Sequence, residues 1–121
     1  MASQLETESS ERDGVYLLTV SGRIDHETAE GFQADLMTAV ENGKPTKGTV
    51  VVDFAGVNYI SSVGLRALML AAKASKAENG FPAVAGYNSE VGEIFQIARF
   101  GMVVKLFDDL DDALHAVSAS T

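Results

Sequence analysis

"TVVVDFAGVNYISSVGLRAL", residues 49–68, is the stretch of sequence that decides the fold. Its opening part, TVVVDF, is rich in β-branched residues and almost continuously apolar, which is typical of a strand buried on both faces in a parallel sheet. Leu65 and Leu68 then stand at helical spacing, so the sequence predicts a loop over 58–64 followed by a helix. Ligands of open parallel sheets gather beyond the carboxyl ends of the strands, which makes this loop the first candidate for function.

Patterns with the strand period and the helix period alternate along the rest of the chain. Further strands are predicted over 15–22, 81–86 and 102–107, with residues 23–25 as a candidate short returning strand. Helices are predicted over 27–42, after the serine pair as far as Gly80, from a cap at Ser89, and from a cap at Asp108 or Asp109. Asp25 or Thr28 is the candidate cap of the first helix. The sequence therefore predicts a single α/β domain with a mixed, mostly parallel sheet of about four to five strands and about four helices.

The chain ends and its composition limit the classes of protein that fit. Residues 1–13 are polar and acidic, so we expect a disordered tail there and a folded domain over 14–119. No segment resembles a signal peptide or a membrane span, which favours a cytoplasmic protein. A net charge of -8 opposes binding to nucleic acid or to anionic membranes, and the absence of cysteine excludes disulfides and thiol chemistry.

No metal or cofactor site is expected. His26 and His115 lie far apart without ligand spacing, and the acidic cluster at residues 108–112 is interpreted as a helix start, where carboxylates favour the positive end of the helix dipole. Neither of the glycine-rich phosphate-binding motifs is present. The sequence therefore indicates neither a metal ion nor a nucleotide.

The adjacent serines do not fit a hydrolase. In the G-x-S-x-G motif of that class, Ile60 would have to be glycine, and His115 is the only histidine that follows the serines. A non-enzymatic role is therefore favoured. One serine suffices to cap the helix, and the other is expected to point outward beside an apolar patch of Tyr59, Ile60 and Val63. From the residues alone, a simple cap and a protein-binding site both stay open.

"VVDFAGVNYISSVGLRAL" resembles the signature of the STAS domain, in particular of the anti-sigma factor antagonists of bacterial partner-switching systems. "VSGRID", residues 20–25, resembles the segment before the first helix of that family. "VGEIFQIARFGMVVKLF", residues 91–107, resembles its third helix and last strand. The resemblance covers nearly all of Val15 to Val117.

The resemblance implies a binding switch and no catalysis. The unmodified antagonist would bind an anti-sigma factor that is also a serine kinase with a histidine-kinase-type ATPase fold, and so release the sigma factor. Phosphorylation of Ser62, or alternatively of Ser61, would end the binding, and a metal-dependent phosphatase would restore it. Asp25, which the residues alone also allow as a helix cap, would belong to the docking surface. The implied partner-binding residues are Asp25, Asn58, Tyr59, Ile60, Ser61, Val63, Gly64 and Arg66.

A second function is compatible with the same resemblance. STAS domains also serve as structural subunits of stress-signalling assemblies or of lipid-transport ABC complexes, without a phosphorylation switch. Ala55 and Ser61 differ from residues that many antagonists carry at these positions, namely serine and aspartate. These departures bear on the identity of the kinase and leave the expected fold unchanged.

Overall fold

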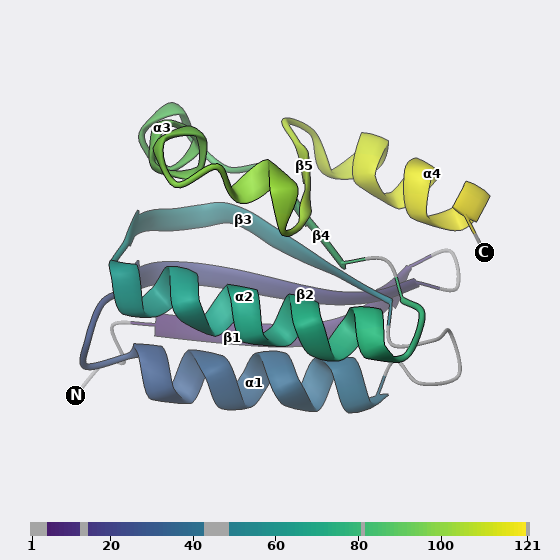
Figure 1. The fold of residues 1–121 in the computed structure, drawn as a ribbon, viewed down its shortest axis with the longest axis horizontal. Coiled ribbons are helices and arrows are strands. Elements are labelled where there is room, and N and C mark those ends of the chain that lie inside the picture. The colour runs from purple at the N-terminus through teal and green to yellow at the C-terminus, as the bar shows by residue number, and fades with distance from the viewer. Residues whose placement is uncertain (1–4, 13–14, 43–48, 81, 121) are drawn as a thin grey trace.

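A computed structural model describes residues 5–12, 15–42, 49–80 and 82–120 of the chain (Figure 1). One sheet has the strand order β1-β2-β3-β4-β5, with β1 antiparallel to β2 and the other neighbours parallel. The strands are β1 (Leu5–Arg12), β2 (Val15–Ile24), β3 (Val50–Ile60), β4 (Pro82–Ala85) and β5 (Lys105–Phe107). The helices are α1 (Ala29–Asn42), α2 (Ser62–Ala77), α3 (Ser89–Ile97), the short 3-10 helix η2 (Phe100–Met102) and α4 (Leu110–Ser120). This architecture confirms the predicted fold class.

Helices cover both faces of the sheet. α1 and α2 run side by side along one face, while α4 lies on the other (Figure 1). Alternate residues of β3 serve the two layers: Val50 and Val52 enter the core under α1 and α2, and Val51 packs in the cluster that includes α4. Over Val50–Phe54 both faces of β3 are largely buried, which explains why this part of its sequence is almost continuously apolar, as predicted. Among the described residues, no helix is long and apolar enough to cross a membrane.

The structure corrects the prediction of a disordered tail over 1–13. Residues 5–12 form β1, which pairs with β2 from Leu5 opposite Gly22 to Arg12 opposite Val15. The Thr7 hydroxyl also donates a hydrogen bond of 2.8 Å to the Asp35 carboxylate of α1. An exposed edge strand needs polar side chains, and its pairing uses backbone groups that any residue supplies. A polar sequence therefore concealed a strand, while residues 1–4 and 13 lie outside the described part.

Two further boundaries were predicted too short. β2 and β3 both run on toward their carboxyl ends, to Ile24 and Ile60, where a returning strand and a loop had been expected. The pairing passes an irregularity between Thr19 and Ser21 of β2. There a Cβ on Gly56 of β3 would lie 2.5 Å from the Cβ of Ser21, so the close approach of the two strands requires glycine.

The carboxyl-terminal part also differs in detail. The strand expected over 102–107 is divided into η2 and the short β5, with Arg99 in the left-handed conformation between α3 and η2. Asn88, and not Ser89, caps α3, since its side-chain oxygen accepts the Val91 N–H at 2.8 Å. Asp109 accepts the Asp111 N–H at 2.7 Å, which confirms the expected cap of α4.

Deletion of residues 1–12 tests the role of β1. We expect the midpoint of thermal unfolding to fall by more than about 5 °C, because the edge of β2 loses its backbone partner and the contact with α1 is lost. Glu8→Ala, which keeps the backbone pairing, should leave the midpoint almost unchanged. Circular dichroism melts measure both variants, and an unaltered midpoint after the deletion would restore the interpretation as a tail.

Candidate functional site

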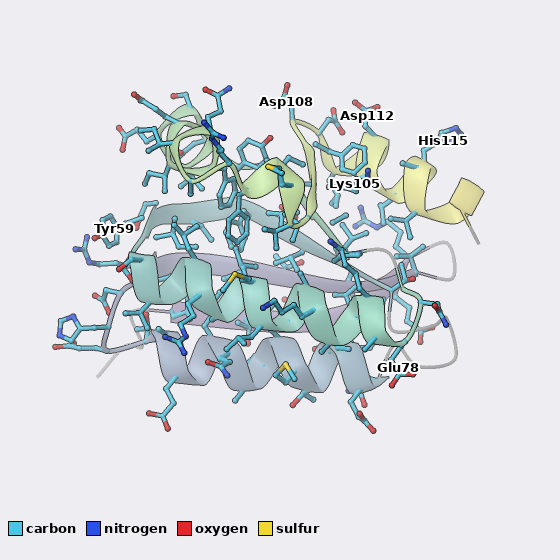
Figure 2. The ribbon with its side chains drawn as sticks, in the orientation of Figure 1. Tyr59, Glu78, Lys105, Asp108, Asp112 and His115 are labelled. Carbon is cyan, nitrogen blue, oxygen red and sulfur yellow. The ribbon has the colours of Figure 1, made fainter. Side chains whose placement is uncertain are left out.

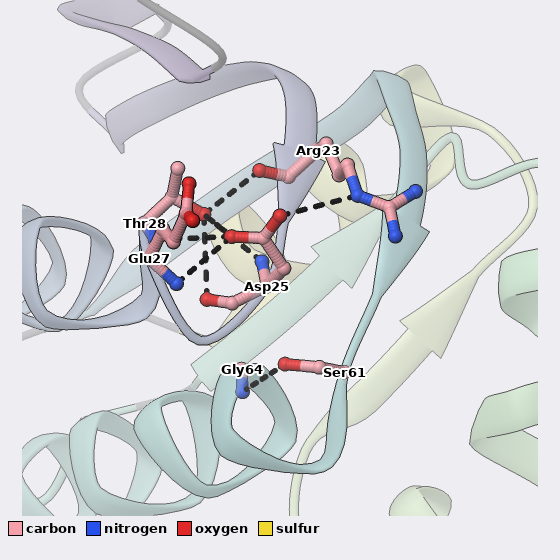
Figure 3. Close-up of polar contacts among 6 residues, drawn as sticks. All are labelled: Arg23, Asp25, Glu27, Thr28, Ser61 and Gly64. Atoms are coloured by element: carbon pink, nitrogen blue, oxygen red, sulfur yellow. Dashed lines mark hydrogen bonds and ion pairs between the residues drawn. The ribbon is translucent and has the colours of Figure 1, made fainter.

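The candidate site lies where β2 and β3 end next to each other. Ile24 and Ile60 are partners in the parallel register, and the Ser61 N–H donates a hydrogen bond of 2.8 Å to the Ile24 carbonyl just beyond it. α1 and α2 therefore both begin at the carboxyl ends of these two strands, and the residues that start each helix face one region (Figure 3). Helix starts expose N–H groups that have no partner within the helix, so the region at these strand ends is suited to binding polar or anionic groups.

The two serines have different positions in α2. Ser61 is the N-cap: its hydroxyl oxygen accepts the Gly64 N–H at 3.2 Å, and its carbonyl accepts the Leu65 N–H at 2.9 Å (Figure 3). Ser62 is the first helical residue and is exposed. The capping interpretation is thereby confirmed for Ser61, and the Ser62 hydroxyl is not needed for it.

Gly64 seats the first turn of α2 directly on the two strand ends. A Cβ at this position would lie 2.6 Å from Cγ2 of Ile24 and 2.8 Å from Cγ1 of Ile60. Any larger residue would push the helix start away from the sheet, or force the packed side chains of Ile24 and Ile60 to move. The position of the Ser62 hydroxyl is thus fixed by the packing beneath it.

Asp25 is held by several donors at the start of α1. Its carboxylate accepts the N–H groups of Glu27 at 3.0 Å and Thr28 at 3.2 Å, and its other oxygen accepts from Arg23 Nε at 3.1 Å. The Thr28 hydroxyl in turn accepts the Asp25 N–H at 2.9 Å, so both predicted caps of the first helix take part. Burial alone would raise the pKa of Asp25, but these backbone hydrogen bonds and Arg23 together hold that pKa below its ordinary value.

Arg23 is a residue that sequence reasoning missed. Its guanidinium carbon lies 4.1 Å from the centre of the Tyr59 ring, at the outer edge of the site where Figure 2 labels Tyr59. Arg23 thus links the Asp25 carboxylate to an exposed aromatic ring. The two residues are opposite each other in the β2–β3 register, which the sequence alone does not reveal.

The exposed surface around Ser62 is smaller than predicted. Val63 is 47% exposed and Tyr59 is 37% exposed, but Ile60 is only 2% exposed because it points into the core beside Gly64. The expectation that Ile60 belongs to an exposed apolar patch is therefore wrong. The predicted residues that are exposed are Asn58, Tyr59, Ser62, Val63 and Arg66, whereas Asp25 and Ser61 are half-buried and Gly64 is buried.

Within the described ranges, no three histidine or acidic side chains come together as candidate metal ligands. The site offers hydroxyls, an arginine, an aromatic ring and helix N–H groups, which suit recognition of another molecule.

Replacement of each serine by alanine separates the two roles. Ser61→Ala removes the cap and should lower the free energy of unfolding by about 1 kcal/mol. Ser62→Ala should change the free energy of unfolding by less than about 0.5 kcal/mol, since alanine favours the helix and no cap is lost. Urea titration measures both values, and equal losses would contradict the division of roles.

The pH dependence of stability tests the state of Asp25. Its pKa is lowered from 3.8 in the folded chain, so the charged form stabilises the fold above that pH, and this contribution is lost as the pH falls through the lowered pKa. We expect Asp25→Asn to be less stable than the wild type at about pH 7, with the difference shrinking at about pH 3. Urea titrations at the two values measure it, with Glu8→Gln on β1 as control, and a constant difference would contradict the interpretation.

The comparisons with known proteins agree with this architecture. The family model described as "STAS domain" matches residues 6–113. BtrV of Bordetella bronchiseptica, whose name classes it provisionally as an anti-sigma factor antagonist, is 32% identical over 88 residues, which is 73% of each chain. An anti-sigma factor antagonist from Mycobacterium paratuberculosis has a crystal structure that matches with a TM-score of 0.82 and 29% identity over 93% of each chain.

A more distant structure has the same fold. SpoIIAA of Bacillus, solved in its phosphorylated form, matches with a TM-score of 0.65 and 19% identity over 93% of this chain and 98% of that one. The resemblance read from the sequence is confirmed by the family match and by the nearer relatives. The chain belongs to the STAS domain family.

Proposed function

We propose that this protein is an anti-sigma factor antagonist that works as a phosphorylation-controlled binding switch in the cytoplasm. In its unphosphorylated form it binds an anti-sigma factor that is also a serine kinase, and the sigma factor is released. Phosphorylation of Ser62 ends the binding, and a metal-dependent phosphatase reverses the modification. The relatives named as anti-sigma factor antagonists support this role.

One observation carries the proposal: the cap of α2 and its exposed hydroxyl belong to two adjacent serines. Because Ser61 makes the capping hydrogen bond, Ser62 is available to an enzyme without loss of that bond. A phosphate on the first helical residue lies near the unpaired N–H groups of the first turn, where negative charge is favoured. The fold therefore persists when Ser62 is modified.

The binding surface is what phosphorylation disrupts. The side chains of Asn58, Tyr59, Val63 and Arg66 are exposed around Ser62, and a partner that covers them buries the neutral hydroxyl. A phosphate adds a charge of about -1.5 to -2 at that point. Burying such a charge without a matching partner is strongly unfavourable, so the complex dissociates.

Asp25 and Arg23 form the second half of the proposed surface. The carboxylate of Asp25 is fixed by the turn before α1 and lies beside the start of α2 (Figure 3). A fixed carboxylate can accept hydrogen bonds from a partner with basic groups, which suits the acidic character of this chain. The same carboxylate repels a phosphate that is introduced nearby.

Phosphorylation and binding are measured with the cognate anti-sigma factor kinase. Incubation with ATP followed by mass spectrometry should place one phosphate on Ser62, and Ser62→Ala should abolish it. Ser62→Asp should weaken binding by at least about thirtyfold in calorimetry, because a charge then enters the interface.

Ser89→Asp is the matched control. Ser89 is likewise exposed and is the first residue of a helix, α3, whose cap is the preceding Asn88. The Ser89→Asp substitution adds the same charge at an equivalent helical position, on a residue that does not belong to the proposed surface. Equal losses of affinity in the two variants, or labelling that persists in Ser62→Ala, would overturn the proposal.

A further inference from the structure

The longest stretch of this chain without an acidic residue is 54–77. The sequence has 17 acidic and 9 basic residues, yet residues 54–77 and 97–107 contain no aspartate or glutamate. The basic residues in these two segments are Arg66, Lys73, Lys76, Arg99 and Lys105. These two stretches are therefore net positive, as are the acid-free residues 14–24 with Arg23 and 42–52 with Lys44 and Lys47.

The fold places these two segments next to each other. α2 lies along the front of the molecule in Figure 1, and η2 and β5 follow directly above it. A groove between α2 and η2 is lined by residues that include Arg66 and Lys73. A second hollow, lined by residues that include Lys76 and Lys105, shares Val103 with the groove. Among the described residues, the lining of the two hollows includes the α2 cations Arg66, Lys73 and Lys76 and no carboxylate. The side chain of Lys105 alternates in β5 with Leu106 of the α1 and α2 core, and it lies toward α4 (Figure 2).

Apolar side chains lie between these cations. Leu65, Met69, Leu70 and Val103 line the groove and are each only partly buried. Met102, which lines the second hollow, is 80% exposed. We call the surface formed by the groove and the second hollow the α2–η2 face. Its apolar stripe with basic borders is characteristic of a surface that receives another chain.

The carboxylates nearest in sequence lie at the margins. Figure 2 shows Glu78 at the far end of α2 and Asp108 at the opposite side of η2 and β5. Asp108 belongs to a different hollow, with Tyr87, where burial and then the charge of Asp108 raise the pKa of the tyrosine. The described residues that line the α2–η2 face therefore include cations and no carboxylate.

We propose that the α2–η2 face docks an acidic amphipathic segment of a protein partner, with apolar side chains against the stripe and carboxylates against the bordering cations. The basic residues of the face favour a partner with negative charge. The apolar stripe favours a peptide with apolar side chains over the phosphate backbone of a nucleic acid. The remaining surface, which carries the excess negative charge, directs such a segment to this face. Ser62 also lines the groove and Arg66 belongs to the surface proposed above, so the two surfaces adjoin at the start of α2. The proposal does not depend on phosphorylation of Ser62, because all measurements use the unmodified chain.

A designed peptide tests the face directly. The probe is an amphipathic helix with leucine on one side and glutamate on the other, and the comparison peptide carries lysine in place of glutamate. Nuclear magnetic resonance titration of the full chain should show saturable shifts at Met69, Lys73 and Val103 with the acidic peptide alone. Lys73→Glu should weaken its binding by about tenfold, and added salt should weaken it as well.

Arg12→Glu is the matched control, since it makes the same change of charge on exposed β1 at the sheet edge. It should alter the affinity by less than about twofold. Circular dichroism verifies that both variants are folded. Equal weakening by both, equal binding of both peptides, or shifts confined to other faces would overturn the proposal. So would binding of vesicles of anionic lipid at this face in preference to the peptide, which would assign it to membranes.

Discussion

The parallel pairing of β2 and β3 beyond Asp53 is the constraint on which the site depends. If β3 ended with the apolar run TVVVDF, α2 would start several residues earlier and away from the start of α1. Instead the pairing passes the irregularity at Gly56 and ends with the hydrogen bond from Ser61 to Ile24. Gly64 then rests on the last isoleucine of each strand. A backbone register thus converts two sequence segments more than thirty residues apart into one surface.

This constraint explains what the sequence could predict. The central strand, α1, α2 and α4 have strong periodic patterns, and the serine pair before Leu65 marks a helix start by simple capping chemistry. The sequence therefore predicted these four elements and the start of α2. β1 was not, because its polar side chains match those of a tail, and its stability comes from backbone pairing.

The details of the site that were missed share a cause. Arg23 contacts Tyr59, and Ile60 turns inward, only because the strands continue and alternate their side chains. A pattern of single residues does not specify the register between two strands when both faces are apolar. The choice between Asp25 and Thr28 as the helix cap was unanswerable for another reason: the two form one reciprocal arrangement.

The composition and length of the two edge strands limit how this protein can bind other proteins. β1 at one edge carries several exposed charged side chains, and β5 at the other edge is only three residues long. Neither edge is a good template for strand addition, the route by which many domains capture extended peptides. Recognition must then rely on side chains carried by helices and by the ends of strands. Such contacts can be altered by a single modification, whereas a ladder of backbone hydrogen bonds would tolerate it.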